Sequence, residues 1–285
     1  MLANAASAGP ASSRGPRSVL RQRVITAALL GGVLLAVVLL LPPWASVALF
    51  TLTILFGAWE WSGFMRAKSL VVRMGFVALI AVALLLSHRY VIDRDALQGV
   101  LWIAALWWMV TFLWVALAPQ RVSPLAAAIA GVLVLVPAWI ALVHLRTAFA
   151  HGALWSLFVL GLAWAADTGA FFAGKFFGRV PLAPRVSPKK TWEGAVGGVC
   201  FGALAGYLAS FALPVQPLAF VLLSASVAAI SIVGDLTESM LKRAAGMKDS
   251  GWLFPGHGGV LDRIDSVTAA APAFLLGVLV FRIAT

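Results

Sequence analysis

The chain has 285 residues, of which 62% are apolar and only 11% are charged, whereas about a quarter of the residues in an ordinary soluble domain are charged. A soluble core of this size cannot hide so much apolar surface, so the composition excludes a soluble globular protein. The single cysteine, Cys200, excludes an internal disulfide and a cysteine metal cluster. The net charge of +11 would suggest nucleic acid in a soluble protein, but its distribution along this chain points to topology instead.

Long apolar runs fill most of the sequence. A hydrocarbon core about 30 Å thick needs roughly 20 apolar residues per helical span. Nine such runs predict an all-α fold, a polytopic transmembrane helical bundle. In chain order they cover residues 24–41, 44–64, 71–87, 98–117, 124–145, 155–177, 195–213, 217–233 and 267–283. Residues 1–23 are expected to form a basic, disordered cytoplasmic tail, and the alternative of a cleaved signal peptide is disfavoured by the long apolar run that follows.

The basic residues are distributed unevenly between the predicted loops. With the N-terminus inside, seventeen of the twenty-one Lys and Arg residues fall in inner segments. The outer side keeps only Arg89, Arg94, Arg146 and Arg282. This positive-inside bias predicts a cytoplasmic N-terminus and an outer C-terminus. The positive charge therefore reflects topology and attraction to anionic headgroups, and no nucleic-acid partner is expected.

The ten acidic residues are distributed just as unevenly. Seven of them lie between Asp167 and Asp265, two more lie in an outer loop, and Glu60 lies near the inner end of the second span. We therefore expect three regions: the tail over residues 1–23, a lipid-facing transmembrane scaffold over 24–150, and a catalytic transmembrane region over 151–285.

Two features of the catalytic region precede its densest stretch. Asp167 lies inside the sixth span, where an ionisable group costs about 2.5–3.5 kcal/mol and so faces either a polar cavity or a structural partner. The inner loop over residues 184–194 suits a polyphosphate, because it combines cations and hydroxyls with one carboxylate; a plain positive-inside loop is the alternative. Its candidate residues are Ser187, Lys189, Lys190, Thr191 and Glu193.

Four glycines follow at strict four-residue spacing, at positions 194, 198, 202 and 206. They share one helix face and permit another backbone to approach closely. Packing within the chain is favoured over a dimer seam.

The densest stretch of polar residues runs from position 231 to position 265. Asp235 and Glu238 share one helix face, and Asp262 and Asp265 share another. A glycine-rich hinge joins the two, so four acids could converge on Mg²⁺, which prefers hard oxygen ligands. The alternative is a salt-bridge network with Lys242, Arg243, Lys248 and Arg263. The hinge also carries His257, which either binds phosphate or acts as an acid, or else only hydrogen-bonds the turn.

At these residues the sequence resembles a known family. Ser239-Met240-Leu241-Lys242-Arg243, Lys248-Asp249 and Pro255-Gly256-His257-Gly258-Gly259-Val260-Leu261-Asp262-Arg263-Ile264-Asp265 are similar to the signature of phosphatidate cytidylyltransferases, the CDP-diacylglycerol synthases. Ala166-Asp167-Thr168-Gly169-Ala170 and Ser187-Pro188-Lys189-Lys190-Thr191-Trp192-Glu193-Gly194 resemble further family motifs in the expected order. The resemblance covers about residues 155–275, with a small departure in Ala170-Phe171-Phe172, where a Tyr is expected in many members.

The resemblance implies a Mg²⁺-dependent reaction in which CTP and phosphatidate give CDP-diacylglycerol and pyrophosphate. Asp235 and Asp262 correspond to metal-binding aspartates, with Asp167 and Asp265 as nearby candidates and a second cation left open. Lys248 and His257 join the two aspartates as catalytic candidates. The substrate-binding candidates are Ser187, Lys189, Lys190, Thr191, Glu193, Lys242, Arg243 and Arg263.

The family also suggests a homodimer in the bacterial inner membrane, embedded in membrane lipids, with its active site facing the cytoplasm. Two rival functions are a transporter or channel, since intramembrane acids also mark ion pathways, and a related enzyme that uses CTP on another lipid. The charges cluster at one interface and no repeat is evident, which disfavours transport.

Overall fold

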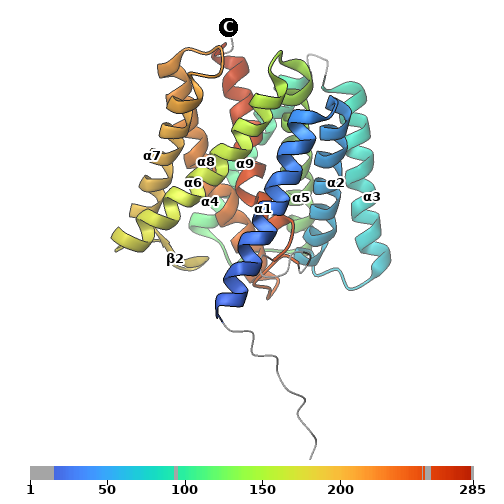
Figure 1. Ribbon diagram of the computed structural model, residues 1–285. Helices are drawn as coiled ribbons and strands as arrows, with labels where there is room; N and C mark the ends of the chain where they lie inside the picture. The colour runs from blue at the N-terminus through green and yellow to red at the C-terminus, as the bar shows by residue number, and fades with distance from the viewer. Residues whose placement is uncertain (1–15, 93–95, 252, 254–257, 284–285) are drawn as a thin grey trace, which may run out of the picture.

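The computed structural model describes residues 16–92, 96–251, 253 and 258–283. Within these residues the chain forms nine helices and one two-stranded sheet, and Figure 1 shows the helices packed side by side as a bundle. This confirms the predicted all-α membrane fold. The elements are α1 (Pro16–Leu40), α2 (Pro43–Phe64), α3 (Leu70–Tyr90), α4 (Ala96–Leu117), α5 (Pro124–Ala148), α6 (Gly152–Phe177), β1 (Pro181–Ala183), β2 (Ser187–Thr191), α7 (Trp192–Ala209), α8 (Pro217–Ala244) and α9 (Leu261–Val280).

Seven of the described helices are long and apolar enough to cross a membrane: α2, α3, α4, α5, α6, α8 and α9. The apolar segment Ile25–Leu40 of α1 is shorter, and α7 has 18 residues, of which several are glycine. The count of nine spans and the direction of the N-terminus therefore stay predictions.

Helix α5 lies in the core of the bundle, although it belongs to the range expected to form a lipid-facing scaffold. Most of its side chains are buried, including Trp139, and it packs against α2, α3, α6 and α9. Ser123 caps its first turn by accepting a hydrogen bond from the backbone N–H of Ala126 (3.1 Å). The N-terminal half thus helps to build the core against which α6 and α9 pack.

The four spaced glycines are packing residues within the chain. A Cβ atom on Gly194 or Gly198 would lie 2.9 Å from a backbone oxygen of α6. A Cβ atom on Gly202 or Gly206 would collide with Ala228 or Ser224 of α8. Glycine therefore lets α7 lie against both neighbours at backbone distance, as the intrachain interpretation predicted.

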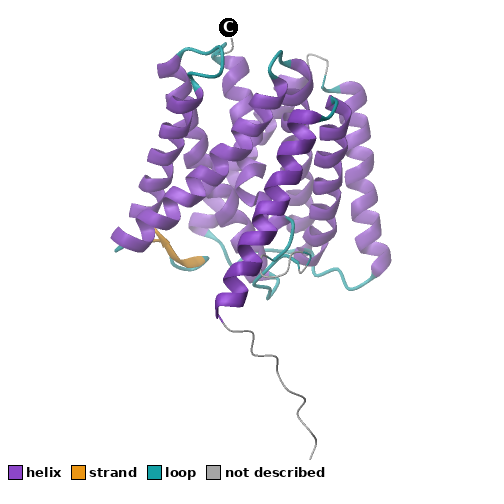
Figure 2. Ribbon diagram, in the orientation of Figure 1, coloured by secondary structure: helices purple, strands orange, loops and turns teal. Residues whose placement is uncertain are grey.

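A β-hairpin between α6 and α7 is a feature that the sequence interpretation missed. Strands β1 and β2 pair in antiparallel register with Ala183 opposite Ser187, and the backbone N–H of Val186 donates to the carbonyl of Ala183 (3.1 Å). The hairpin, the start of α1 and the connection from α8 to α9 lie at the same end of the bundle, opposite the end of α9 (Figures 1 and 2).

Candidate active site

Three aspartates from three helices gather at the end of the bundle that carries the hairpin. Asp167 of α6, Asp235 of α8 and Asp265 of α9 lie close enough for each pair to interact electrostatically. Close packing brings them together, because a Cβ atom on Gly234 would lie 2.7 Å from the carbonyl oxygen of Asp265. Ser266 of α9 connects this helix to α6, because its hydroxyl donates a hydrogen bond to Asp167 Oδ2 (2.7 Å). The convergence of these three predicted residues follows from helix packing.

The hairpin supplies a cation to this acid cluster. Lys190 forms an ion pair with Asp235, and both side chains are about one quarter exposed (26% and 25%). Within the described residues, Lys190 Nζ makes no hydrogen bond beyond this ion pair. The Lys190 ammonium also interacts electrostatically with Asp167, so Lys190 offsets part of the negative charge of the cluster.

Lys242 belongs to a second, more buried cluster. Its ammonium lies 3.0 Å from Glu238 Oε1 and 2.7 Å from Asp262 Oδ1. The other oxygen of Asp262 accepts hydrogen bonds from the backbone N–H of Ser250 (3.0 Å), the Ser250 hydroxyl (3.0 Å) and the backbone N–H of Gly259 (2.8 Å). For Lys242, Glu238 and Asp262, the geometry corresponds to the alternative salt-bridge network.

Glu60 is the residue that sequence reasoning did not assign to the site. Its buried carboxylate comes from α2 and accepts from the Val260 N–H (3.0 Å) and the Leu261 N–H (2.9 Å). The Ser250 hydroxyl lies 2.9 Å from Glu60 Oε2 and 3.0 Å from Asp262 Oδ2, and donates its single proton to one of these two carboxylates at a time. Glu60 therefore binds the glycine-rich loop and the N-terminus of α9, where a negative charge also meets the positive end of the helix dipole. The sequence did contain one indication, because Glu60 is an acid near the end of an apolar span, where ionisable side chains are usually functional.

The loop is shaped around the Glu60 carboxylate. A Cβ atom on Gly251 would collide with Glu60 Oε1, and one on Gly259 would collide with Glu60 Oε2 and the Ser250 hydroxyl. Glycine is thus required at both positions because the chain passes directly over a carboxylate.

The remaining basic candidates are solvent-facing. Lys189, Arg243 and Lys248 are exposed, and in the described part of the chain they have no ion-pair partner. Arg263 is exposed at the start of α9 and interacts electrostatically with Asp167. His257, predicted as a catalytic candidate, lies outside the described residues.

The hydroxyl and carboxylate candidates of the hairpin have local structural partners. Thr191 caps α7 by accepting from the backbone N–H of Gly194 (3.2 Å), and Ser187 begins strand β2. Glu193 accepts a hydrogen bond from the Val180 N–H (3.3 Å). Hydrogen bonds from backbone N–H groups, foremost that of Arg179, lower the pKa of the Glu193 carboxyl. These contacts hold the hairpin against the start of α7, with Lys189 and Lys190 on strand β2.

The carboxylates match the chemistry of a hard divalent cation. Among the described residues, no three His, Cys, Asp or Glu side chains form a ready metal-binding group. Mg²⁺ usually needs only one or two protein carboxylates, because phosphate oxygens and waters complete its shell. Asp235, partly exposed beside Asp167 and Asp265, meets that requirement, whereas Glu238 is buried and paired with Lys242 (3.0 Å).

The fold and this site define a polytopic membrane protein with a mixed acidic and basic centre at one end of its bundle. The model of the cytidylyltransferase family matches residues 21–281. The phosphatidate cytidylyltransferase of Haemophilus influenzae is 37% identical over 281 residues, covering 90% of this chain and 97% of its own length. That of Pseudomonas aeruginosa is 42% identical over 265 residues, covering 90% and 96%.

A further relative matches less than half of the chain. The phosphatidate cytidylyltransferase of a Synechocystis species is 47% identical over 126 residues, which are 44% of this chain and 43% of its own. The chain belongs to the cytidylyltransferase family, so the predicted resemblance is confirmed.

Proposed function

We propose that this protein is a CTP:phosphatidate cytidylyltransferase, a nucleotidyltransferase of phospholipid biosynthesis. It converts CTP and phosphatidate into CDP-diacylglycerol and pyrophosphate. The observation that carries this proposal is similarity over nine tenths of the chain to two relatives that bear this name. The site agrees with it, because acids and cations meet at one end of a bundle whose flanks are apolar.

The chemistry requires two anions to approach each other. An oxygen of the phosphatidate phosphate attacks the α-phosphorus of CTP, a new P–O bond forms, and the bond to the pyrophosphate leaving group breaks. No covalent enzyme intermediate is needed. Lys189, Arg243 and Lys248 are exposed cations that can neutralise the triphosphate. Lys190, positioned by Asp235, is the cation nearest to the acid cluster.

Mg²⁺ fits the acid cluster and would be held by Asp235 together with Asp167 or Asp265. When bound, it supplies charge neutralisation and polarises phosphate oxygens. Asp262, the other predicted ligand, already accepts hydrogen bonds from Lys242, Ser250 and Gly259. A metal role for Asp262 therefore requires that Lys242 give up Oδ1, whereas its loop-holding role needs no rearrangement.

The remaining parts of the proposal concern the assembly and its place in the cell. The protein is a homodimer in the bacterial inner membrane, and its active site faces the cytoplasm, where CTP is found. The distribution of basic residues and the bacterial origin of the relatives support this location.

The test is to incubate membranes containing the protein with radiolabelled CTP and a panel of lipid acceptors. Label is expected in CDP-diacylglycerol with phosphatidate alone, and membranes with equal amounts of Asp235→Asn protein serve as the control. Label in another lipid would show an enzyme with a different acceptor. No labelled lipid from any acceptor would overturn the proposal and favour a transporter.

A further inference from the structure

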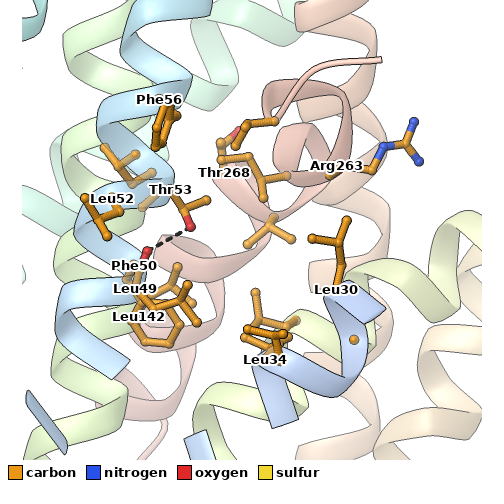
Figure 3. Close-up of a pocket in the computed structure, with 18 of the residues that line it drawn as sticks. Leu30, Leu34, Leu49, Phe50, Leu52, Thr53, Phe56, Leu142, Arg263 and Thr268 are labelled. Atoms are coloured by element: carbon orange, nitrogen blue, oxygen red, sulfur yellow. Dashed lines mark hydrogen bonds between the residues drawn. The ribbon is translucent and has the colours of Figure 1, made fainter. Parts of the chain in front are cut away.

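An apolar cavity of about 600 Å³ borders the start of α9, the helix that carries Asp265. Its walls come from α1, α2, α5, α6, the loop residue Leu253 and the start of α9. The volume falls within the range of about 300–1,000 Å³ that is usual for small-molecule sites. Figure 3 shows leucine and phenylalanine side chains of α1, α2 and α5 converging on this space.

The few hydroxyls in the walls are already satisfied. Thr53 donates to the carbonyl of Leu49 (2.8 Å), and Thr268 donates to the carbonyl of Asp265 (2.6 Å). Both hydroxyls thus bond to their own helices and leave the cavity with hydrocarbon walls. A nucleotide or a chain of waters would lack partners there, so the walls select an apolar occupant.

One end of the cavity is different, because Arg263 lies there. Arg263 directly follows Asp262, interacts electrostatically with Asp167 and shares a face of α9 with Val267, which also lines the cavity. In Figure 3 its guanidinium points away from the labelled apolar side chains. The apolar stem therefore lines the cavity while the charged head reaches the side of the acid cluster.

Helix α1 forms one wall of the cavity and leaves space there for a ligand. Gly31 lines the cavity, and a Cβ atom there would meet no other atom within 4 Å. Val33 also lines the cavity and is nevertheless 54% exposed, and Leu29 on the opposite face of α1 is 64% exposed. A lipid can therefore approach this region sideways from the membrane.

We propose that this cavity binds one acyl chain of the phosphatidate substrate, with the lipid phosphate at the Arg263 end. The inference rests on the proposed function and adds where the lipid lies. An amphipathic site with hydrocarbon walls and one cation matches an acyl chain joined to a phosphate. It also places the phosphate beside Asp167, where attack on CTP would take place.

Gly31→Phe tests the proposal, because Gly31 lines the cavity and a Cβ atom there meets no other atom within 4 Å, so the ring can occupy the space of an acyl chain. Gly32→Phe is the matched control, since Gly32 also has nothing within 4 Å and does not line the cavity. KM is measured for dioctanoyl and for long-chain phosphatidate in mixed micelles. For Gly31→Phe, the KM for the long-chain lipid should rise roughly tenfold or more, because even one methylene group changes binding in an apolar pocket by about that factor. The KM for CTP and that for the dioctanoyl lipid should change far less.

The outcomes separate the two proposals. A wild-type protein that makes no CDP-lipid would overturn the proposed function. An active wild type whose chain-length preference is the same in Gly31→Phe would overturn only the cavity assignment. Equal loss for both chain lengths would also overturn it, because a structural lipid gives that result. Long-chain phosphatidate with a photoreactive group should label α1 and α2 in the wild type, and labelling confined to other helices would contradict the assignment.

Discussion

Glu60 connects the two halves of the chain through a single carboxylate. Its hydrogen-bond partners Ser250, Val260 and Leu261 lie about 190 to 200 positions later in the sequence. Since Ser250 and Val260 flank the glycine-rich turn, Glu60 sets the position of the loop that carries Lys248. We regard it as a positioning residue that acts through this loop.

Replacing Glu60 by Gln keeps the size of the side chain and removes the charge and one acceptor. At least one buried N–H or hydroxyl then loses its partner, which should lower the free energy of unfolding by about 1–3 kcal/mol. Because the loop is misplaced as well, kcat per folded molecule should fall strongly. Thermal unfolding in detergent and active-site-normalised kinetics measure the two effects.

Ser62→Ala is the control for the Glu60 variant. Ser62 is a buried residue of the same helix, but its hydroxyl accepts from Arg73 Nε (2.8 Å) and does not touch the loop. This variant should lose stability with unchanged kcat per folded molecule. If Glu60→Gln behaved in the same way, its role would be structural only.

Asp235 and Asp262 can be separated by their different surroundings. Asp235→Asn should abolish most cytidylyl transfer with normal membrane insertion, with partial rescue at high Mg²⁺ or with Mn²⁺, because a hard cation loses a charged ligand. Asp262→Asn should in addition lower the melting temperature, since Lys242, Ser250 and Gly259 lose the carboxylate that they share. Activity per folded molecule across a metal titration gives the comparison. A wild-type metal curve in both variants would defeat the metal assignment.

Some site residues could be predicted from the sequence and others could not. Asp167, Asp235 and Asp265 were identifiable because an acid in an apolar helix has few uses. The buried, ion-paired position of Lys242 could not be predicted, because a cation at the inner end of a helix can equally well bind phosphate or form a salt bridge. Glu60 was missed as a site residue because its partners are brought near only by the packing of α2 against α9.

At the scale of elements, α7 depends on glycine for its close packing. A Cβ atom at Gly202 would lie 2.4 Å from Ala228 Cβ, so Gly202→Ala forces α7 and α8 apart. Such overpacking should cost about 1–3 kcal/mol. Gly161→Ala is the control, because Gly161 of α6 has nothing within 4 Å and alanine favours helix by about 1 kcal/mol.

Far-UV circular dichroism during heating compares the two alanine variants. The melting temperature should fall for Gly202→Ala and hold or rise for Gly161→Ala. An unchanged melting temperature for Gly202→Ala, together with loss of an oligomer in size-exclusion chromatography, would instead assign the glycine face to a dimer seam.

The helices were predictable in a way that the hairpin was not. Long apolar runs need internal hydrogen bonding in lipid, and only a helix provides it within one segment. Strands β1 and β2 have three and five residues, and each contains a proline, so no alternating pattern marks them. Their pairing depends on the anchoring of both ends by α6 and the capped start of α7, which a local sequence window does not show.

At the scale of the whole molecule, the charge distribution and the geometry point to the same topology. The hairpin and the connection from α8 to α9 lie at one end of the bundle, together with the start of α1 (Figure 1). The connections from α5 to α6 and from α7 to α8 lie at the other end. If α7 crosses the membrane, as the predicted topology of nine spans requires, the hairpin and Gln216 must face opposite compartments.

Cysteine labelling decides this question. Cys200 is exposed and is first replaced by Ser to give a background without thiols. On that background, Arg185→Cys and Asp249→Cys should react with an impermeant thiol reagent only from the cytosolic side, and Ala150→Cys and Gln216→Cys only from the outer side. All four positions are exposed, so a missing signal reflects the compartment and not burial. Labelling of position 216 from the same side as position 185 would show that α7 does not span. Labelling of positions 185 and 249 from outside would invert the topology, and would leave CTP on the wrong side of the membrane for the proposed reaction.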